Sequence, residues 1–217
     1  TIAICHTAFN ILCTAIMLPC AGLLEKLSMK LIPEPKGADA KETFNELDER
    51  LMITPAVAIE RCRVVTEKMA SISKASLYKA LDQLNVFDPD VCQEIRDEEG
   101  QVDKYEDILG SYLVKLNTYP LTDKDMRESA KLLHLIGDIE RISDHAVNIV
   151  ESAEELNEKG IEFSEFAKGE LKVIIGAVHE IVELSYAAYS QNDIRAAKCV
   201  EPLEQVIDNL KEKLRTR

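Results

Sequence analysis

Helix-starting signals recur along residues 54–217 at intervals of one long helix, and this spacing favours an all-α fold. The signals are capping residues, two of them followed by proline: Thr54-Pro55, Asp88-Pro89, Thr122, Ser164, and Asn192 or Asp193. The segments between them carry apolar residues at helical spacing, and the sequence shows no alternating strand pattern of useful length. Long amphipathic helices joined by short loops pack as antiparallel neighbours, so the sequence predicts a helical bundle.

The expected helices run from each signal to the next break in the pattern. They end near Leu84, Asn117, Lys159 and Ser190, and the fifth is still helical at Arg217, with Pro202 as a possible kink. Gly160 marks the end of the third helix. On that helix the inward-facing stripe is predicted to be Leu132, Ile136, Ile139, Ser143, Ala146 and Val150.

The first 24 residues form an apolar run, "TIAICHTAFNILCTAIMLPCAGLL". About 20 mostly apolar residues suffice to span a bilayer, so residues 1–32 are predicted to be a membrane segment, with a buried helix of a globular domain as the alternative. The basic residues that follow, Lys26, Lys30, Lys36 and Lys41, place the next segment in the cytoplasm. Residues 33–46 contain two prolines and a glycine and are predicted to be a linker. Because the chain begins with Thr1, we expect it to be part of a longer protein.

Composition excludes some classes of partner. The net charge of −13 argues against nucleic-acid binding and favours cations or basic partners. The six cysteines show no CxxC motif and no metal-ligand spacing with histidine, which indicates reduced thiols in a cytoplasmic compartment.

Carboxylates recur at a matching spacing. Glu140 and Asp144 lie four residues apart beside the inward stripe, where shielded like charges must be protonated, paired or bound to a cation. Two further segments, "EEGQVDKYEDIL" and "LEQVIDNLKEKL", overlay with an offset of 105 residues, and this overlay matches Glu99 with Glu204 and Asp103 with Asp208. The repeat predicts two tandem three-helix bundles, residues 47–160 and 161–217. The second is incomplete, because its third helix would follow Arg217.

These six carboxylates are the candidate metal ligands. Oxygen-only ligands on facing helices suit a hard cation such as magnesium, calcium or manganese, or iron in a carboxylate cluster. The expected ions are divalent or ferric: iron, manganese, zinc or magnesium. The alternative is a solvated acidic face, because other pairs of this spacing occur, such as Glu94/Glu98 and Glu151/Glu155. A ferritin-like di-metal enzyme is a further alternative, but it needs Glu-x-x-His motifs, and no glutamate here has a histidine three residues on.

Three stretches carry a resemblance to known families. The stretch "LIGDIERISDHAVNI" resembles the signature of the PhoU family. Members of this family are phosphate-signalling proteins built from two three-helix bundles. The last membrane segment of bacterial sodium/phosphate cotransporters resembles "CHTAFNILCTAIMLP", and the junction typical of those proteins resembles "LDERLMITPAVAIERCRVVTEKMA". The resemblance implies that Glu140 and Asp144 bind metal, with Glu99/Asp103 and Glu204/Asp208 as the acidic motifs of the preceding helices.

The function that the resemblance implies is regulatory and not enzymatic. We expect a cytoplasmic metal-binding PhoU-like domain of a sodium-dependent phosphate transporter, attached to the inner or plasma membrane, with residues after about 32 in the cytoplasm. Its expected partners are the membrane, the rest of the transporter, other phosphate-signalling proteins or a second copy. The transporter's Gln-Ser-rich substrate motifs are missing, so this chain would not transport phosphate by itself. A tethered helical adaptor without metal remains the alternative.

Overall fold

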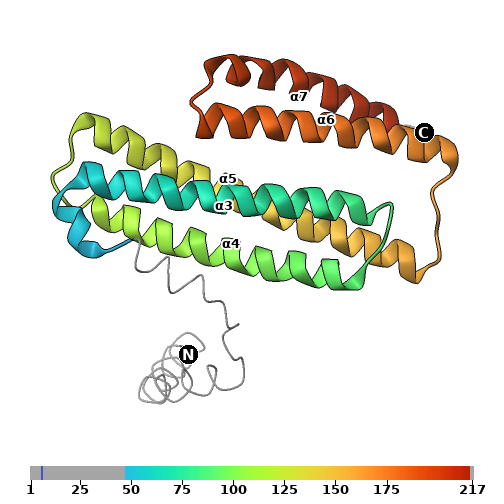
Figure 1. The fold of residues 1–217 in the computed structure, drawn as a ribbon, viewed down its shortest axis with the longest axis horizontal. Helices are drawn as coiled ribbons and strands as arrows, with labels where there is room; N and C mark the ends of the chain where they lie inside the picture. The colour runs from blue at the N-terminus through green and yellow to red at the C-terminus, as the bar shows by residue number, and fades with distance from the viewer. Residues whose placement is uncertain (1–5, 7–46, 216–217) are drawn as a thin grey trace. The chain divides into compact units, whose positions relative to one another are not determined.

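The computed structural model describes His6 and residues 47–215, and these residues are helical apart from turns and connections (Figure 1). The elements are the 3-10 helix η1 (Glu49–Ile53) and the α-helices α3 (Pro55–Gln83), α4 (Pro89–Leu116), α5 (Asp123–Glu158), α6 (Glu165–Ser190) and α7 (Ile194–Arg215). The all-α prediction is confirmed for this part of the chain. The expected membrane segment and linker, residues 1–46, lie outside the described residues except for His6. Among the helices described, none is long and apolar enough to cross a membrane.

The predicted helix starts are confirmed by their capping contacts. Thr122 and Asp125 form a capping box, in which the Asp125 backbone N–H donates to the Thr122 hydroxyl at 3.2 Å. Ser164 accepts from the Ala167 N–H at 3.2 Å in the same way. Thr54 differs, because its side chain makes no capping hydrogen bond and Pro55 alone favours the start of α3.

Helices α3, α4 and α5 pack pairwise into an antiparallel three-helix bundle (Figure 1). All six residues of the predicted inward stripe of α5 are buried, and the same helix also buries Ser129 and Ala153. Larger apolar side chains of α3 and α4 complete the core, including Val65, Met69, Leu109 and Leu113. The bundle therefore holds α4 and α5 side by side along their length, and this places their outward-facing side chains next to each other.

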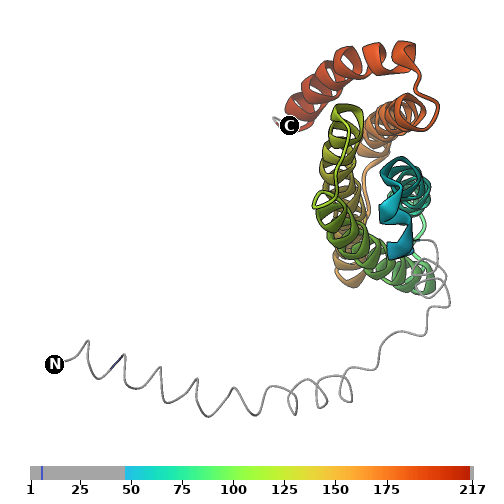
Figure 2. The same ribbon diagram turned by 90° about the vertical axis from the view of Figure 1, so that its left-hand side faces the viewer.

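Helices α6 and α7 form a separate hairpin beside the bundle (Figure 2). No residue of α6 and only Ala196 of α7 is fully buried. The hairpin touches the bundle mainly through α6 and α3. There the His179 ring stacks on Tyr78 with 4.0 Å between centroids, and the Lys74 ammonium lies 3.1 Å from Glu183 Oε1. This hairpin occupies the place of the predicted partial second bundle, and its assignment as part of such a bundle stays a prediction.

Candidate metal centre

The bundle places four of the six predicted ligands on the neighbouring helices α4 and α5. Glu99 and Asp103 lie one turn apart on α4, and Glu140 and Asp144 lie one turn apart on α5. The negative charge of Asp144 acts on Glu99, and that of Asp103 acts on Glu140, so the two pairs interact across the helix boundary. Glu106, one turn beyond Asp103, joins them by acting on Glu140. We call these five carboxylates the α4–α5 acidic cluster.

Partial burial and mutual repulsion make the α4–α5 acidic cluster unfavourable when it is fully charged. Burial is the largest cause that raises the pKa of Glu99, and the charges of Asp103 and Asp144 raise it further. Burial also raises the pKa of Glu140, followed by the charge of Asp144 and a hydrogen bond with it. The charges acting on both groups come from other carboxylates only. A bound cation would relieve this repulsion directly.

Two other acidic pairs of the same spacing are in contact with lysines. Lys79 of α3 reaches both Glu94 and Glu98, with 2.6 Å from its ammonium nitrogen to an oxygen of each. Glu155 forms an ion pair with Lys159 one turn further along α5. The solvated-face interpretation therefore fits these pairs well. It fits Glu140/Asp144 less well, because the charges acting on Glu140 are negative.

The donor set fits a metal in kind but is not assembled. Oxygen-only donors from two adjacent helices are the ligands that hard cations prefer. Within the described residues, however, no three Asp, Glu, His or Cys side chains already converge closely enough to hold a metal ion. Asp103 and Asp144 are exposed, whereas Glu99, Glu106 and Glu140 are half-buried. Binding would therefore require the exposed side chains to turn toward the half-buried ones.

The third predicted pair is placed elsewhere. Glu204 and Asp208 lie on the exposed face of α7, and Asp208 forms an ion pair with Lys211 at 3.3 Å. They are not among the groups that act on Glu99 or Glu140. Their role as metal ligands stays a prediction for a separate site.

Sequence reasoning missed Glu106 as a member of the cluster. Its position was readable, because Glu99, Asp103 and Glu106 follow one another at spacings of four and three residues along one helix face. The search for Glu-x-x-x-Asp pairs alone excluded it. A second contact between α4 and α5, in which Arg96 donates to both oxygens of Glu154 at 2.9 and 2.6 Å, was also missed.

Comparison with known proteins identifies the segment that carries this cluster. Residues 66–153 match the family described as PhoU domain. Residues 66–153 are PhoU-like. A phosphate-specific transport system accessory protein, PhoU homolog 1 of Thermotoga maritima, is 26% identical over 150 residues, which cover 68% of this chain and 63% of that protein. The match therefore spans less than two thirds of this curated relative. No solved structure matches the chain.

The PhoU-like segment contains most of α3, all of α4 and most of α5. All five residues of the α4–α5 acidic cluster fall inside it, whereas Glu204 and Asp208 fall outside. The α6–α7 hairpin also lies beyond its end.

Proposed function

We propose that this chain is a PhoU-like regulatory part of a phosphate-transport system, and that its α4–α5 acidic cluster binds iron, manganese, zinc or magnesium. The proposal of phosphate regulation draws on the PhoU match over residues 66–153 and on the printed name of the Thermotoga maritima relative. The role is regulatory and not catalytic. Attachment to a sodium/phosphate cotransporter at the plasma membrane, with the helices in the cytoplasm, completes the proposal and draws on the resemblance of residues 5–19.

The observation that carries the metal proposal is the electrostatic state of Glu99 and Glu140. Both pKa values are raised by burial and by neighbouring carboxylates. A bound cation offsets the repulsion between carboxylates that destabilises the ligand-free cluster. The same residues therefore destabilise the cluster without metal and favour it with metal. Glu99 and Asp103 would hold the cation from α4, and Glu140 and Asp144 would hold it from α5.

Such binding would couple two helices to a signal. A cation shared by α4 and α5 would resist any separation of the two helices, since both supply its ligands. Regulation then requires that the cation, or phosphate held on it, bind one arrangement of the bundle more tightly than another. The expected partners of the favoured arrangement are the membrane part of the transporter, other phosphate-signalling proteins, or a second copy.

Elemental analysis of the full chain, dialysed without chelator, tests the metal proposal. A Glu140→Gln/Asp144→Asn double variant removes the α5 charges, and we expect it to lose the metal that the wild type retains. The matched control is Glu151→Gln/Glu155→Gln, which removes two carboxylates of the same spacing from the same helix and should retain the metal. Equal metal content in both variants would overturn the assignment of the ligands.

Membrane fractionation tests the proposed attachment separately. The full chain should sediment with membranes, and deletion of residues 1–32 should release it. A deleted chain that still sediments with membranes would contradict attachment through that segment, whatever its metal content.

A metal-free helical adaptor is the second candidate function. It is favoured by the exposure of Asp103 and Asp144 and by the lack of three converging ligands among the described residues. Under this alternative the wild-type chain would carry no metal, and divalent cations would leave its melting temperature unchanged.

A further inference from the structure

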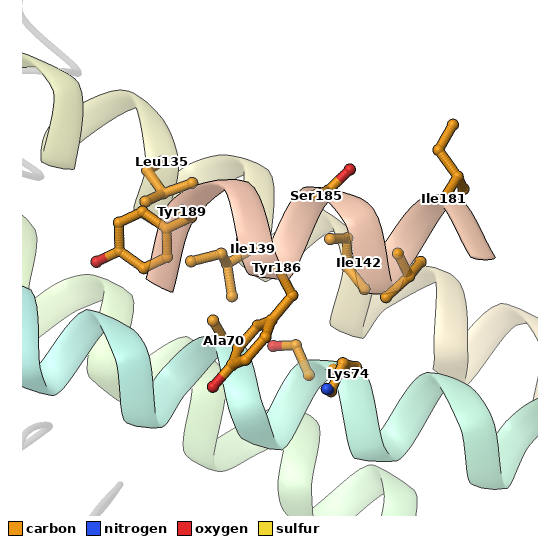
Figure 3. A pocket seen from close by; sticks show the side chains of 11 residues that line it. Ala70, Lys74, Leu135, Ile139, Ile142, Ile181, Ser185, Tyr186 and Tyr189 are labelled. Atoms are coloured by element: carbon orange, nitrogen blue, oxygen red, sulfur yellow. The ribbon is translucent and has the colours of Figure 1, made fainter. Parts of the chain in front are cut away.

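A pocket of about 240 Å³ lies between α3, α5 and α6 (Figure 3). It opens where α6 rests on the bundle without filling the groove between α3 and α5. The residues around it are Ala70, Ser73, Lys74, Leu135, Ile139, Ile142, Ile181, Val182, Ser185, Tyr186 and Tyr189. None of them belongs to the α4–α5 acidic cluster, so the cavity is a separate candidate site.

The surface of this cavity is almost entirely apolar. Branched aliphatic side chains of α5 and α6 supply most of it, and Figure 3 shows the ring of Tyr186 extending from α6 toward Ala70 and Lys74. Among the described residues that line the cavity, Lys74 alone is charged. A ligand would therefore gain most from apolar contacts and would meet few polar groups.

Two of the polar side chains at the edge of the cavity, Lys74 and Ser73, are already engaged. The Lys74 ammonium pairs with Glu183 at 3.1 Å and lies 4.2 Å from the centre of the Tyr186 ring. The Ser73 hydroxyl donates to the Met69 carbonyl at 3.1 Å. A charged ligand would have to compete with these contacts. It would also lose its hydration without gaining an ion-pair partner, so the surroundings favour an uncharged molecule.

The size of the cavity restricts the ligand further. An enclosed apolar protein cavity of roughly 150 Å³ binds benzene, and the pocket here is partly open to solvent. The larger volume here accommodates a benzene ring with one or two small substituents. Unfilled apolar volume lacks partner atoms for its lining, so a ligand that fills it restores dispersion contacts between α6 and the bundle.

We propose that this cavity binds a small uncharged molecule with an aromatic or branched aliphatic body, and that the bound molecule strengthens the attachment of α6 to α3 and α5. The inference is independent of the metal proposal, because it uses none of the same side chains. It gives the α6–α7 hairpin a ligand-dependent contact with the PhoU-like segment.

A titration of the full chain with p-cresol, followed by methyl NMR, tests the site. The side chains of Ile139 and Ile142 line the cavity. Their methyl signals should shift until they saturate at one p-cresol molecule per chain. Those of Ile59 and Ile95, which are buried elsewhere in the bundle, serve as the internal control and should not shift. Bound p-cresol should also slow amide hydrogen exchange in α6. Equal or non-saturating shifts at all four isoleucines would overturn the proposal.

Two variants that fill the cavity provide a second test. Ala70→Leu adds volume from α3 and Val182→Phe adds it from α6, and each should weaken p-cresol binding at least tenfold while the helical circular dichroism is retained. Ala75→Leu, an exposed position on α3, is the matched control and should bind as the wild type does. Undiminished binding in a folded cavity-filling variant would overturn the assignment. Shifts of the same methyl groups that depend on protein concentration without p-cresol would instead assign the cavity to a side chain of a second copy, and would also overturn it.

Discussion

Glu140 and Asp144 lie one turn apart on α5, and burial together with the negative charge of Asp144 raises the pKa of Glu140. Glu140 is half-buried while Asp144 is exposed, so the two like charges meet at the edge of the bundle. The pair is therefore a site of stored repulsion that either a proton or a metal ion would relieve.

Neutralising Glu140 should stabilise the metal-free protein. A carboxyl whose pKa is raised on folding contributes stability below its unfolded pKa, and this contribution is lost as the pH rises through its folded pKa. Glu140→Gln should therefore unfold at a higher urea concentration than the wild type at pH 7.5, by roughly 0.2–0.5 kcal/mol, as expected for relief of one like-charge pair on a helix. The difference should disappear near pH 4. A variant less stable than the wild type at pH 7.5 without metal would contradict the proposed repulsion.

The Arg96–Glu154 ion pair should show the opposite dependence on pH. Hydrogen bonds from Arg96 are the largest cause that lowers the pKa of Glu154 in the folded protein. The ion pair therefore stabilises the fold above the pKa that Glu154 has in the unfolded chain, and this contribution is lost as the pH falls through the pKa that it has in the folded protein. Glu154→Gln should lower the stability by about 0.5–1 kcal/mol at pH 7.5, because the pair is half-exposed and bidentate. The loss should be smaller at pH 3. Urea unfolding at the two pH values measures it, and Glu151→Gln on the same helix is the control.

Much of the fold follows from the sequence because local signals set it. The caps at Asp88, Thr122 and Ser164 fixed helix starts to within a residue, since each satisfies backbone N–H groups that the helix itself leaves free. The stripe on α5 was predicted residue by residue, since a helix that covers a core must turn one face inward. The position of α6 could not be predicted in this way. It has apolar residues on several faces, so its periodicity does not select one partner.

The site was less predictable than the fold. Helical spacing placed Glu140 beside Asp144, but only the packing of α5 against α4 brings Glu99, Asp103 and Glu106 close to them. The same packing directs Lys79 onto Glu94 and Glu98, which the sequence could not distinguish from the candidate pairs. Which carboxylates remain without a cation is a tertiary property, because the neutralising lysine comes from a different helix.

Two glycine substitutions should have opposite effects on stability. Gly137 lies within α5, and a Cβ atom added there would meet nothing within 4 Å, so Gly137→Ala should raise stability by about 0.5–1 kcal/mol through its higher helix propensity. Gly160 has a φ of +60° after the end of α5, where an L side chain is strained, so Gly160→Ala should lower stability by about 1 kcal/mol. The midpoints of urea unfolding measure both. Changes of the same sign would contradict the described backbone at one of the two positions.

The contact between Tyr78 and His179 should control how firmly α6 is held on the bundle. The Tyr78 hydroxyl donates to Glu183 Oε1 at 2.9 Å, and its ring stacks on His179. Tyr78→Phe keeps the stacking and removes the hydrogen bond, whereas His179→Ala removes the stacking, and each contribution is about 0.5–1.5 kcal/mol. In both variants α6 should therefore separate from the bundle more often than it does in the wild type.

Amide hydrogen exchange measures this local opening. Exchange in α6 and α7 should become several-fold faster in both variants, while exchange in α4, which does not touch this contact, should keep its wild-type rate. Glu180→Gln, an exposed position on α6, is the control and should leave all rates unchanged. Faster exchange spread evenly over α3, α4 and α5 would show that the substitution weakens the whole bundle, and the hairpin would then be part of one cooperative unit with it.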